Sequence, residues 1–184
     1  TIFSWEIGNE PRAFSDENKK AFTKWLKQTS KYIKSLDKNH MVTIGTEGKH
    51  GCEEDIDLFE ITHTDKNIDY LCMHIWPKNW SWLDVKDIKG SLQVSIDNTN
   101  EYIKEHEAVA KKLNKPIVLE EFGFPRDNHL YTLDDPTTAR DAYYENAFKQ
   151  ITHAINNGSP LAGCNIWAWG GFGRPQHEFW QKGD

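Results

Sequence analysis

Apolar residues along the chain follow two alternating patterns, short strand-like runs and longer stretches with the 3.6-residue period of an amphipathic helix. The strand-like runs predict strands at 1–5, 41–45, 70–76, 117–122 and 162–169. Helices are expected over 22–36 after a Ser15 cap, over 96–113, and from Asp135-Pro136 to a stop at Asn157-Gly158. A short stretch at 56–59 is ambiguous but could be helical.

Repeated alternation of strand and helix predicts parallel strands, because parallel neighbours need a long crossover that a helix can supply. This leaves a (β/α) barrel or an open doubly wound sheet. Connections that enter strands are short, whereas those that leave strands at 77–93, 124–134 and 170–184 are long. One end of the sheet therefore carries the elaboration, as in barrels. Since no glycine-rich phosphate loop follows a strand, a nucleotide-binding sheet is disfavoured.

The expected fold class is α/β, a (β/α)8 TIM barrel of which only strands four to eight lie in this chain. Five strands cannot close an eight-stranded barrel, which usually needs about 250 residues. Residues 1–184 are accordingly interpreted as the C-terminal portion of a single barrel domain. Alone, this portion would leave two unpaired sheet edges, so we expect it to require the upstream half of its own barrel.

Composition narrows the function classes. With a net charge of −6 and no basic stripe evident in the sequence, nucleic acid is not an expected partner, and the chain is too polar for a membrane span. Eight tryptophans favour ligands with flat apolar faces, such as sugar rings, although a packed core would also use some of them. The three cysteines follow no metal or disulfide spacing.

Two glutamates stand where predicted strands end. Glu10 follows the first strand in Asn9-Glu10-Pro11-Arg12, and Glu121 ends the fourth. Hydrolysis of a glycosidic bond with retention needs one carboxyl group to protonate the leaving oxygen and a second, about 5 Å away, to attack the anomeric carbon. Asn9 could donate to the sugar 2-hydroxyl. The alternative is that these acids are merely solvated or cap the following helices.

The paired motifs Asn9-Glu10-Pro11 and Glu121-Phe122-Gly123 resemble those of glycoside hydrolase family 5, over nearly the whole chain. The resemblance implies that Glu10 is the acid/base and Glu121 the nucleophile, in a catalytic domain that needs no cofactor. Glu120 should then point to the opposite side of its strand.

His74 and Trp76 share one side of their predicted strand. In the family a His-x-Tyr pair occupies this strand end, which implies that His74 binds the reacting sugar. Because Trp76 replaces the tyrosine, a phenol bond to the nucleophile is absent, and Trp76 is expected to be a wall of the site. A strand histidine alone is more often a core residue.

The last predicted strand contains Trp167 and Trp169, both on one side. The resemblance places Trp167 under the reacting sugar, whereas Trp169 is equally well explained as barrel filling. Loop aromatics on the same face could stack sugars at neighbouring subsites or clamp loops: Trp80, Trp82, Phe172, Phe179 and Trp180.

The histidine spacing predicts no catalytic metal. Asn-Glu-Pro-Arg and Trp-Ala-Trp-Gly-Gly look most like the β-mannanase branch, in which Arg12 would line an aglycone subsite. The implied function is retaining hydrolysis of β-1,4-mannosidic linkages in mannan or manno-oligosaccharides, in a secreted, periplasmic or cell-surface location. Endo and exo action both stay open. The alternatives are a β-1,4-glucanase of the same family and an inactive carbohydrate-binding fragment.

Overall fold

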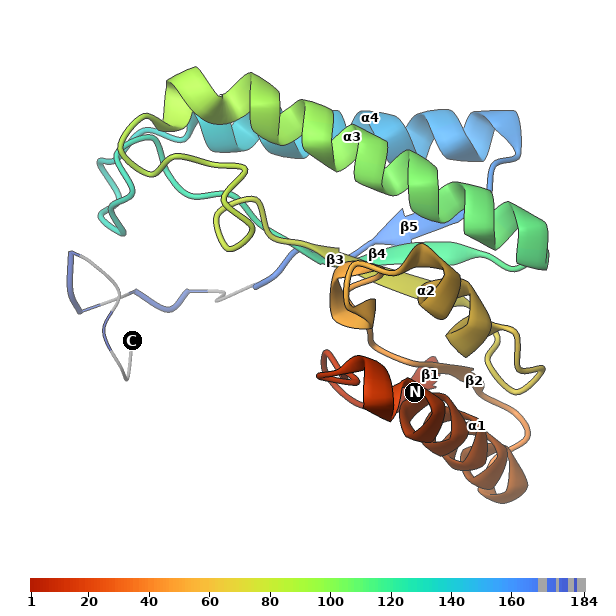
Figure 1. The fold of residues 1–184 in the computed structure, drawn as a ribbon. Helices are drawn as coiled ribbons and strands as arrows, with labels where there is room; N and C mark the ends of the chain where they lie inside the picture. The colour runs from red at the N-terminus through yellow and green to blue at the C-terminus, as the bar shows by residue number, and fades with distance from the viewer. Residues whose placement is uncertain (169–171, 175, 179–180, 182–184) are drawn as a thin grey trace.

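The structure, a computed structural model, describes all residues except 169–171, 175, 179–180 and 182–184. Strands and helices alternate along the described chain, as the sequence pattern predicts (Figure 1). The strands are β1 (Ser4–Glu6), β2 (Met41–Thr43), β3 (Leu71–Ile75), β4 (Ile117–Phe122) and β5 (Leu161–Cys164). The α-helices are α1 (Lys19–Leu36), α2 (Ile56–His63), α3 (Ile88–Leu113) and α4 (Thr138–Asn157), with short 3-10 helices at Asp16–Asn18 and His50–Cys52.

All strand pairs in the described chain are parallel, which confirms the α/β class. β1 pairs with β2, and β3, β4 and β5 form a second sheet in that order. The carboxyl ends of the strands therefore point the same way. As a result, side chains that follow different strands meet at one end of the molecule.

The two sheets adjoin between β2 and β3 without a continuous ladder. Asp69 N–H donates to Val42 O at 2.8 Å at one end, and His74 N–H donates to Glu47 O at 3.3 Å at the other. Between them the Cys72 sulfur accepts from the backbone of Gly45 and Thr46, at 3.1 and 3.2 Å. A buried thiol thus supplies polar contacts where the ladder is interrupted.

Helices cover one face of each sheet. α3 and α4 run side by side across β3–β5, and α1 lies beside β1 and β2 (Figure 1). The larger core cluster lies between β3–β5 and α2, α3 and α4, and the smaller cluster lies between β1–β2 and α1. Burial of these apolar faces holds the strands, and with them the strand ends, in fixed relative positions.

Several expected boundaries differ from the structure. α3 begins at Ile88, eight residues before the expected start at 96, and β1 spans Ser4–Glu6 in place of 1–5. β5 ends at Cys164, so Trp167 lies in the segment that follows the strand. Ser15 precedes the first 3-10 helix but makes no capping side-chain bond. Asp135 does not cap α4 but accepts hydrogen bonds from the backbone of Asn128 and Leu130. The N-terminal amide of Ala139 in α4 is instead bonded by Asp127 Oδ1 at 2.8 Å, because a carboxylate from the preceding loop reaches it.

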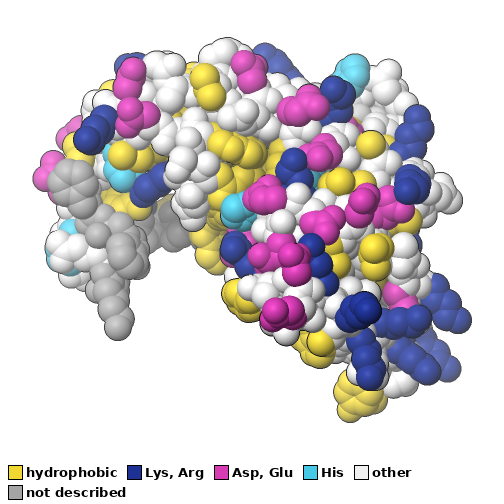
Figure 2. Space-filling model, in the orientation of Figure 1, with side chains coloured by type: hydrophobic (Ala, Val, Ile, Leu, Met, Phe, Trp, Pro, Cys, Tyr) yellow, Lys and Arg dark blue, Asp and Glu magenta, His cyan; other side chains and the backbone are white. Residues whose placement is uncertain are grey.

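The surface shows one departure from the expected charge pattern. Lys and Arg side chains gather over α1, at the lower right of Figure 2, where Lys20, Lys24, Lys27 and Lys31 share one exposed helix face. A local basic stripe therefore exists on a chain of net charge −6. None of the helices in the described residues has the length and apolar content to cross a bilayer.

A buried polar pair tests the packing of α3 on α4. The Thr99 and Tyr143 hydroxyls bond at 2.9 Å within the core. We predict that Tyr143→Phe lowers the free energy of unfolding by about 1–2 kcal/mol, because the Thr99 hydroxyl loses its partner. Urea denaturation measures the effect, and the double variant with Thr99→Val should recover part of the loss. Additive losses would contradict this account of the interface.

Candidate active site

Glu10, His74 and Glu121 come together at the carboxyl ends of the strands. His74 Nδ1 donates to Glu10 Oε1 at 3.0 Å and lies 3.5 Å from Glu121 Oε2. One ligand atom from each of the three residues lies within 4.8 Å of the others. The two carboxyl groups that the sequence places 111 positions apart are therefore neighbours, with a buried imidazole between them.

Strand register explains this meeting. β3 and β4 pair so that His74 stands opposite Glu121, after a register shift between Met73 and His74. The register passes over Glu120, so that Glu121 and not Glu120 pairs with His74. Glu10 follows β1 by four residues and reaches the same place. Its amide donates to Gly45 O at 2.8 Å.

The electrostatics of Glu121 follow from this crowding. Burial is the largest cause that raises the pKa of Glu121, and the negative charges of Glu10 and Glu47 add to it. His74 and a hydrogen-bonding interaction with the Trp76 side chain act in the opposite direction. The pair thus has unequal surroundings, since 16% of the Glu121 side chain is exposed but 28% of the Glu10 side chain.

Glu6 in β1 and Glu120 in β4 form a second pair of interacting acids. Tyr70 donates from its hydroxyl to Glu120 Oε1 at 3.0 Å, so Glu120 turns away from Glu121 as predicted. Burial raises the pKa of Glu120, and the charge of Glu6 raises it further. The pKa of Glu6 is also raised, chiefly by burial. These acids do not line the cavity described next.

Glu10 and Glu121 line a cavity of about 990 Å³. Its walls include segments that follow each of the five described strands, which is the arrangement expected at the carboxyl end of a barrel sheet. The predicted substrate-binding residues Asn9, Arg12, Trp76 and Trp167 all contribute to the lining. The volume and the aromatic walls suit a ligand of several rings.

His74 is more deeply buried than the other predicted site residues that the structure describes. Its side chain is only 1% exposed and is not part of the cavity lining. The Nε2 atom of the imidazole is buried with no hydrogen-bond partner among the residues that the structure describes. This geometry favours a role in orienting Glu10, whereas contact with the sugar stays a prediction.

The Trp76 ring and the Trp167 backbone both approach Gly123 closely. A β-carbon on Gly123 would come within 2.9 Å of the Trp76 ring and 3.1 Å of the Trp167 carbonyl oxygen. Only glycine allows both aromatic residues to approach the strand end that carries Glu121. Trp76 lines the cavity and its side chain interacts with Glu121. Its expected role as a wall for the sugar stays a prediction.

The remaining aromatic predictions divide. Trp80 lines the cavity, whereas Trp82 packs edge-on against Trp80 and supports it. Phe172 is fully exposed and does not line the cavity. The predictions for Trp169, Phe179 and Trp180 fall outside the described residues.

Sequence reasoning missed Glu47, which lines the cavity with its side chain 3% exposed and forms an ion pair with Arg12. Its position gave a usable signal, since it follows β2 at the same end of the sheet as Glu10 and Glu121. Glu6 was also missed, although it ends β1.

The three central residues present one nitrogen and two oxygen ligands that a divalent cation could also use. The expectation that no metal takes part in catalysis stays a prediction. The geometry also fits acid/base and nucleophilic chemistry with two carboxyl groups.

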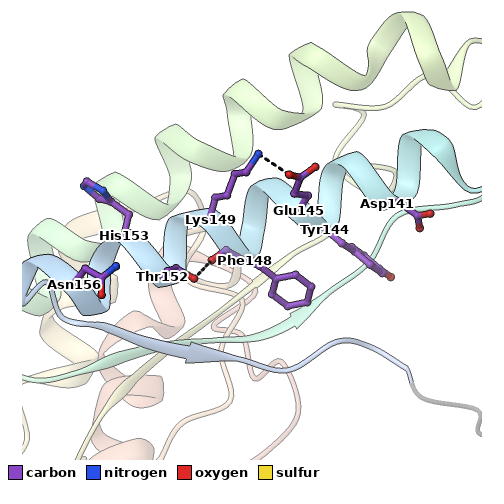
Figure 3. A pocket seen from close by; sticks show the side chains of 8 residues that line it. All are labelled: Asp141, Tyr144, Glu145, Phe148, Lys149, Thr152, His153 and Asn156. Carbon is purple, nitrogen blue, oxygen red and sulfur yellow. Dashed lines mark hydrogen bonds and ion pairs between the residues drawn. The ribbon is translucent and has the colours of Figure 1, made fainter.

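A second cavity, of about 690 Å³, runs along α4 (Figure 3). Its Glu145 and Lys149 neutralise each other at 2.7 Å, and Thr152 donates to the backbone of Phe148. Among the described residues that line it, no acid pair faces a common centre. Its described lining thus offers no counterpart to the paired carboxyl groups of Glu10 and Glu121.

The chain resembles known proteins in family pattern, in sequence and in fold. Residues 1–184 match the family described as GH family 5 beta-mannosidase-like. Mannan endo-1,4-beta-mannosidase 4 of Solanum lycopersicum is 31% identical over 91% of this chain and 42% of its own length. Mannan endo-1,4-beta-mannosidase A of Aspergillus aculeatus is 37% identical over 66% of this chain and 32% of its own length.

Solved structures show the same likeness. The glycoside hydrolase family 5 mannosidase of Rhizomucor miehei has a TM-score of 0.82 at 34% identity, over 96% of this chain and 41% of its own. An endo-1,4-β-D-mannanase of Thermotoga petrophila RKU-1 shares the fold with a TM-score of 0.65 at 24% identity, over 100% of this chain and 51% of its own. The chain thus spans about two fifths of the length of the first relatives that it matches.

The proximity of the two carboxyl groups predicts a coupled titration. Because the charge of Glu10 raises the pKa of Glu121, we predict that Glu10→Gln lowers the pKa of Glu121. Carbon-13 NMR of the side-chain carboxyl groups measures the shift. Glu60→Gln, at a surface ion pair with Lys112, is the control and should leave Glu121 unchanged. An unchanged Glu121 titration in Glu10→Gln would show that the two groups do not interact.

Proposed function

Because the chain belongs to the β-mannosidase-like group of glycoside hydrolase family 5, we propose that it carries the catalytic pair of a retaining glycoside hydrolase that cleaves β-1,4-mannosidic linkages. The observation that carries the proposal is the separation of Glu10 and Glu121, whose nearest ligand atoms lie within 4.8 Å. Retaining enzymes keep their carboxyl groups about 5–5.5 Å apart, whereas inverting enzymes leave about 6.5–9.5 Å for a water molecule.

In the proposed mechanism Glu121 attacks the anomeric carbon while Glu10 protonates the departing oxygen. A covalent ester forms between the sugar C1 and a Glu121 oxygen. Glu10, now ionised, takes a proton from water, which then displaces the ester with a second inversion. His74 supports the ionised Glu10 through its Nδ1 bond, and Asn9 is placed beside it to contact the sugar 2-hydroxyl.

The substrate assignment rests on the relatives. Those compared above by sequence are named mannan endo-1,4-beta-mannosidases. The Rhizomucor miehei mannosidase is described in complex with mannosyl-fructose. Cavity walls from the 77–83 and 124–131 loops support the binding of mannan or manno-oligosaccharides. The proposed location, secreted, periplasmic or at the cell surface, rests on the family resemblance alone. A β-1,4-glucanase is the runner-up, and comparing initial rates on mannan and carboxymethyl cellulose separates the two.

We also propose that β1 to β5 correspond to strands four to eight of a (β/α)8 barrel, with 1–184 the C-terminal part of one catalytic domain. The coverage of about two fifths of the relatives supports this, as does the exposure of Trp5 at the β1 edge. Activity assays on the chain alone and on the chain with upstream barrel strands distinguish an enzyme from a carbohydrate-binding fragment. Product lengths from mannohexaose then separate endo from exo action.

The two glutamates should respond differently to substitution. We predict that Glu121→Gln abolishes turnover of every substrate, because no nucleophile remains. Glu10→Ala should spare aryl mannosides with excellent leaving groups, which depart without a proton, and azide should restore its rate by replacing the water that needs a base. Rates with 2,4-dinitrophenyl and 4-methylphenyl β-mannosides measure the contrast. Equal loss on both would remove the acid role from Glu10.

The rate should depend on pH in a bell-shaped curve. Because the pKa of Glu121 is raised, its ionised form is lost at a higher pH than for an ordinary glutamate, and the acidic limb of kcat/KM should lie correspondingly high. The pH dependence of kcat/KM on mannotetraose measures this acidic limb, and an optimum on the alkaline side would contradict the assignment.

A further inference from the structure

We propose that Glu47 and Arg12 form a clamp that positions the Glu10 carboxyl group for proton transfer. This inference rests on the proposed function, in which Glu10 is the acid/base. Glu47 is thereby assigned a positioning role, and Arg12 a role beyond lining an aglycone subsite.

The clamp is a closed cycle of contacts. Arg12 lies two residues beyond Glu10 and pairs through its guanidinium with the Glu47 carboxylate. The backbone oxygen of Glu47 accepts from the amide of His74 at 3.3 Å. His74 closes the cycle, because its Nδ1 donates to Glu10 Oε1 at 3.0 Å. Displacement of Arg12, Glu47 or His74 therefore disturbs Glu10 both through its side-chain bond to His74 and through the chain that follows it.

Glu10 needs such support because its backbone is strained. Its φ angle is +47°, in the left-handed region that few residues other than glycine adopt. Strain of this kind persists only where surrounding contacts over-determine the conformation. The bond from Glu10 N–H to Gly45 O at 2.8 Å holds the residue on one side, and the Arg12–Glu47 pair holds the chain immediately after it.

Glu47 is itself firmly anchored. Its carbonyl oxygen also accepts from the Tyr102 hydroxyl at 2.7 Å, so α3 fixes the segment after β2. Gly48 allows this close approach, because a β-carbon there would lie 2.6 Å from the Tyr102 hydroxyl and φ is +94°. A side chain only 3% exposed holds a charge that needs a partner, and Arg12 supplies it.

The Glu47 charge also acts on the nucleophile. The groups that act on Glu121 are His74, Glu10, Trp76 and Glu47, and Glu47 is one of the two acids that raise the pKa of Glu121. Loss of the Glu47 charge should therefore move the acidic limb of the rate profile to lower pH. A part that only stabilises the fold would leave this limb in place.

Three variants test the clamp in the active, upstream-extended protein: Glu47→Gln, Arg12→Gln and the double variant. The probes are mannotetraose, whose leaving sugar needs the proton, and 2,4-dinitrophenyl β-mannoside, whose leaving group does not. We expect kcat on mannotetraose to fall about tenfold or more in each variant, with far smaller losses on the aryl mannoside. The double variant should lose little beyond either single variant. Glu60→Gln is the charge-matched control on the surface.

Equal losses on both probes, additive losses, or a KM effect confined to Arg12→Gln would overturn the clamp. Such results would leave Arg12 as a substrate contact only. A crystal structure of Glu47→Gln gives a readout that does not need turnover, since the 3.0 Å contact between Glu10 and His74 should lengthen. An unchanged contact would contradict the proposal even if the parent protein proved inactive, whereas parental inactivity alone would count against the proposed function.

Discussion

The site depends on one buried imidazole held between two carboxyl groups. His74 Nδ1 donates to Glu10 Oε1 at 3.0 Å and lies 3.5 Å from Glu121 Oε2, while the side chain of His74 is almost fully buried. Two acids this close repel each other when both are ionised. A donor fixed between them orients one acid and reduces the repulsion, so that the groups can differ in their tasks although both are glutamates.

The fold serves this contact through strand register. Parallel pairing brings the ends of β1, β3 and β4 to one end of the molecule, and the shift at Met73/His74 sets His74 against Glu121. The large core beneath α3 and α4 fixes β3 and β4, whereas β1 carries Glu10 on the smaller cluster with α1. The bond between Glu10 and His74 therefore also bridges two separately packed parts of the described chain.

The sequence predicted what periodicity and spacing encode. The alternation of strand and helix was right, and the bounds of β4 were predicted without error. The strand-end positions of Glu10, Glu121 and Trp167 were enough to identify part of the cavity lining. The opposite orientation of Glu120 followed from the two-residue period of a strand and was confirmed by its bond to Tyr70.

Features that depend on contacts between distant segments could not be predicted. Asp135 resembles a helix cap in sequence, but its carboxylate accepts hydrogen bonds from Asn128 and Leu130 within its own loop, whose conformation the periodicity of apolar residues does not encode. His74 is buried where the register of β3 and β4 shifts, and Glu47 pairs with Arg12, which follows a different strand. Such partners become visible only when the strands are assembled.

The central claim is that Glu121 bonds directly to the anomeric carbon while Glu10 lies beside it. The most direct measurement is to incubate the active protein with 2-deoxy-2-fluoro-β-mannosyl fluoride, which forms the ester but slows its hydrolysis, and to map the label by peptide mass spectrometry. The account predicts one fluoromannosyl group, on Glu121. A label on another residue, or complete hydrolysis of the probe to a sugar of inverted anomeric configuration without any label, would contradict it.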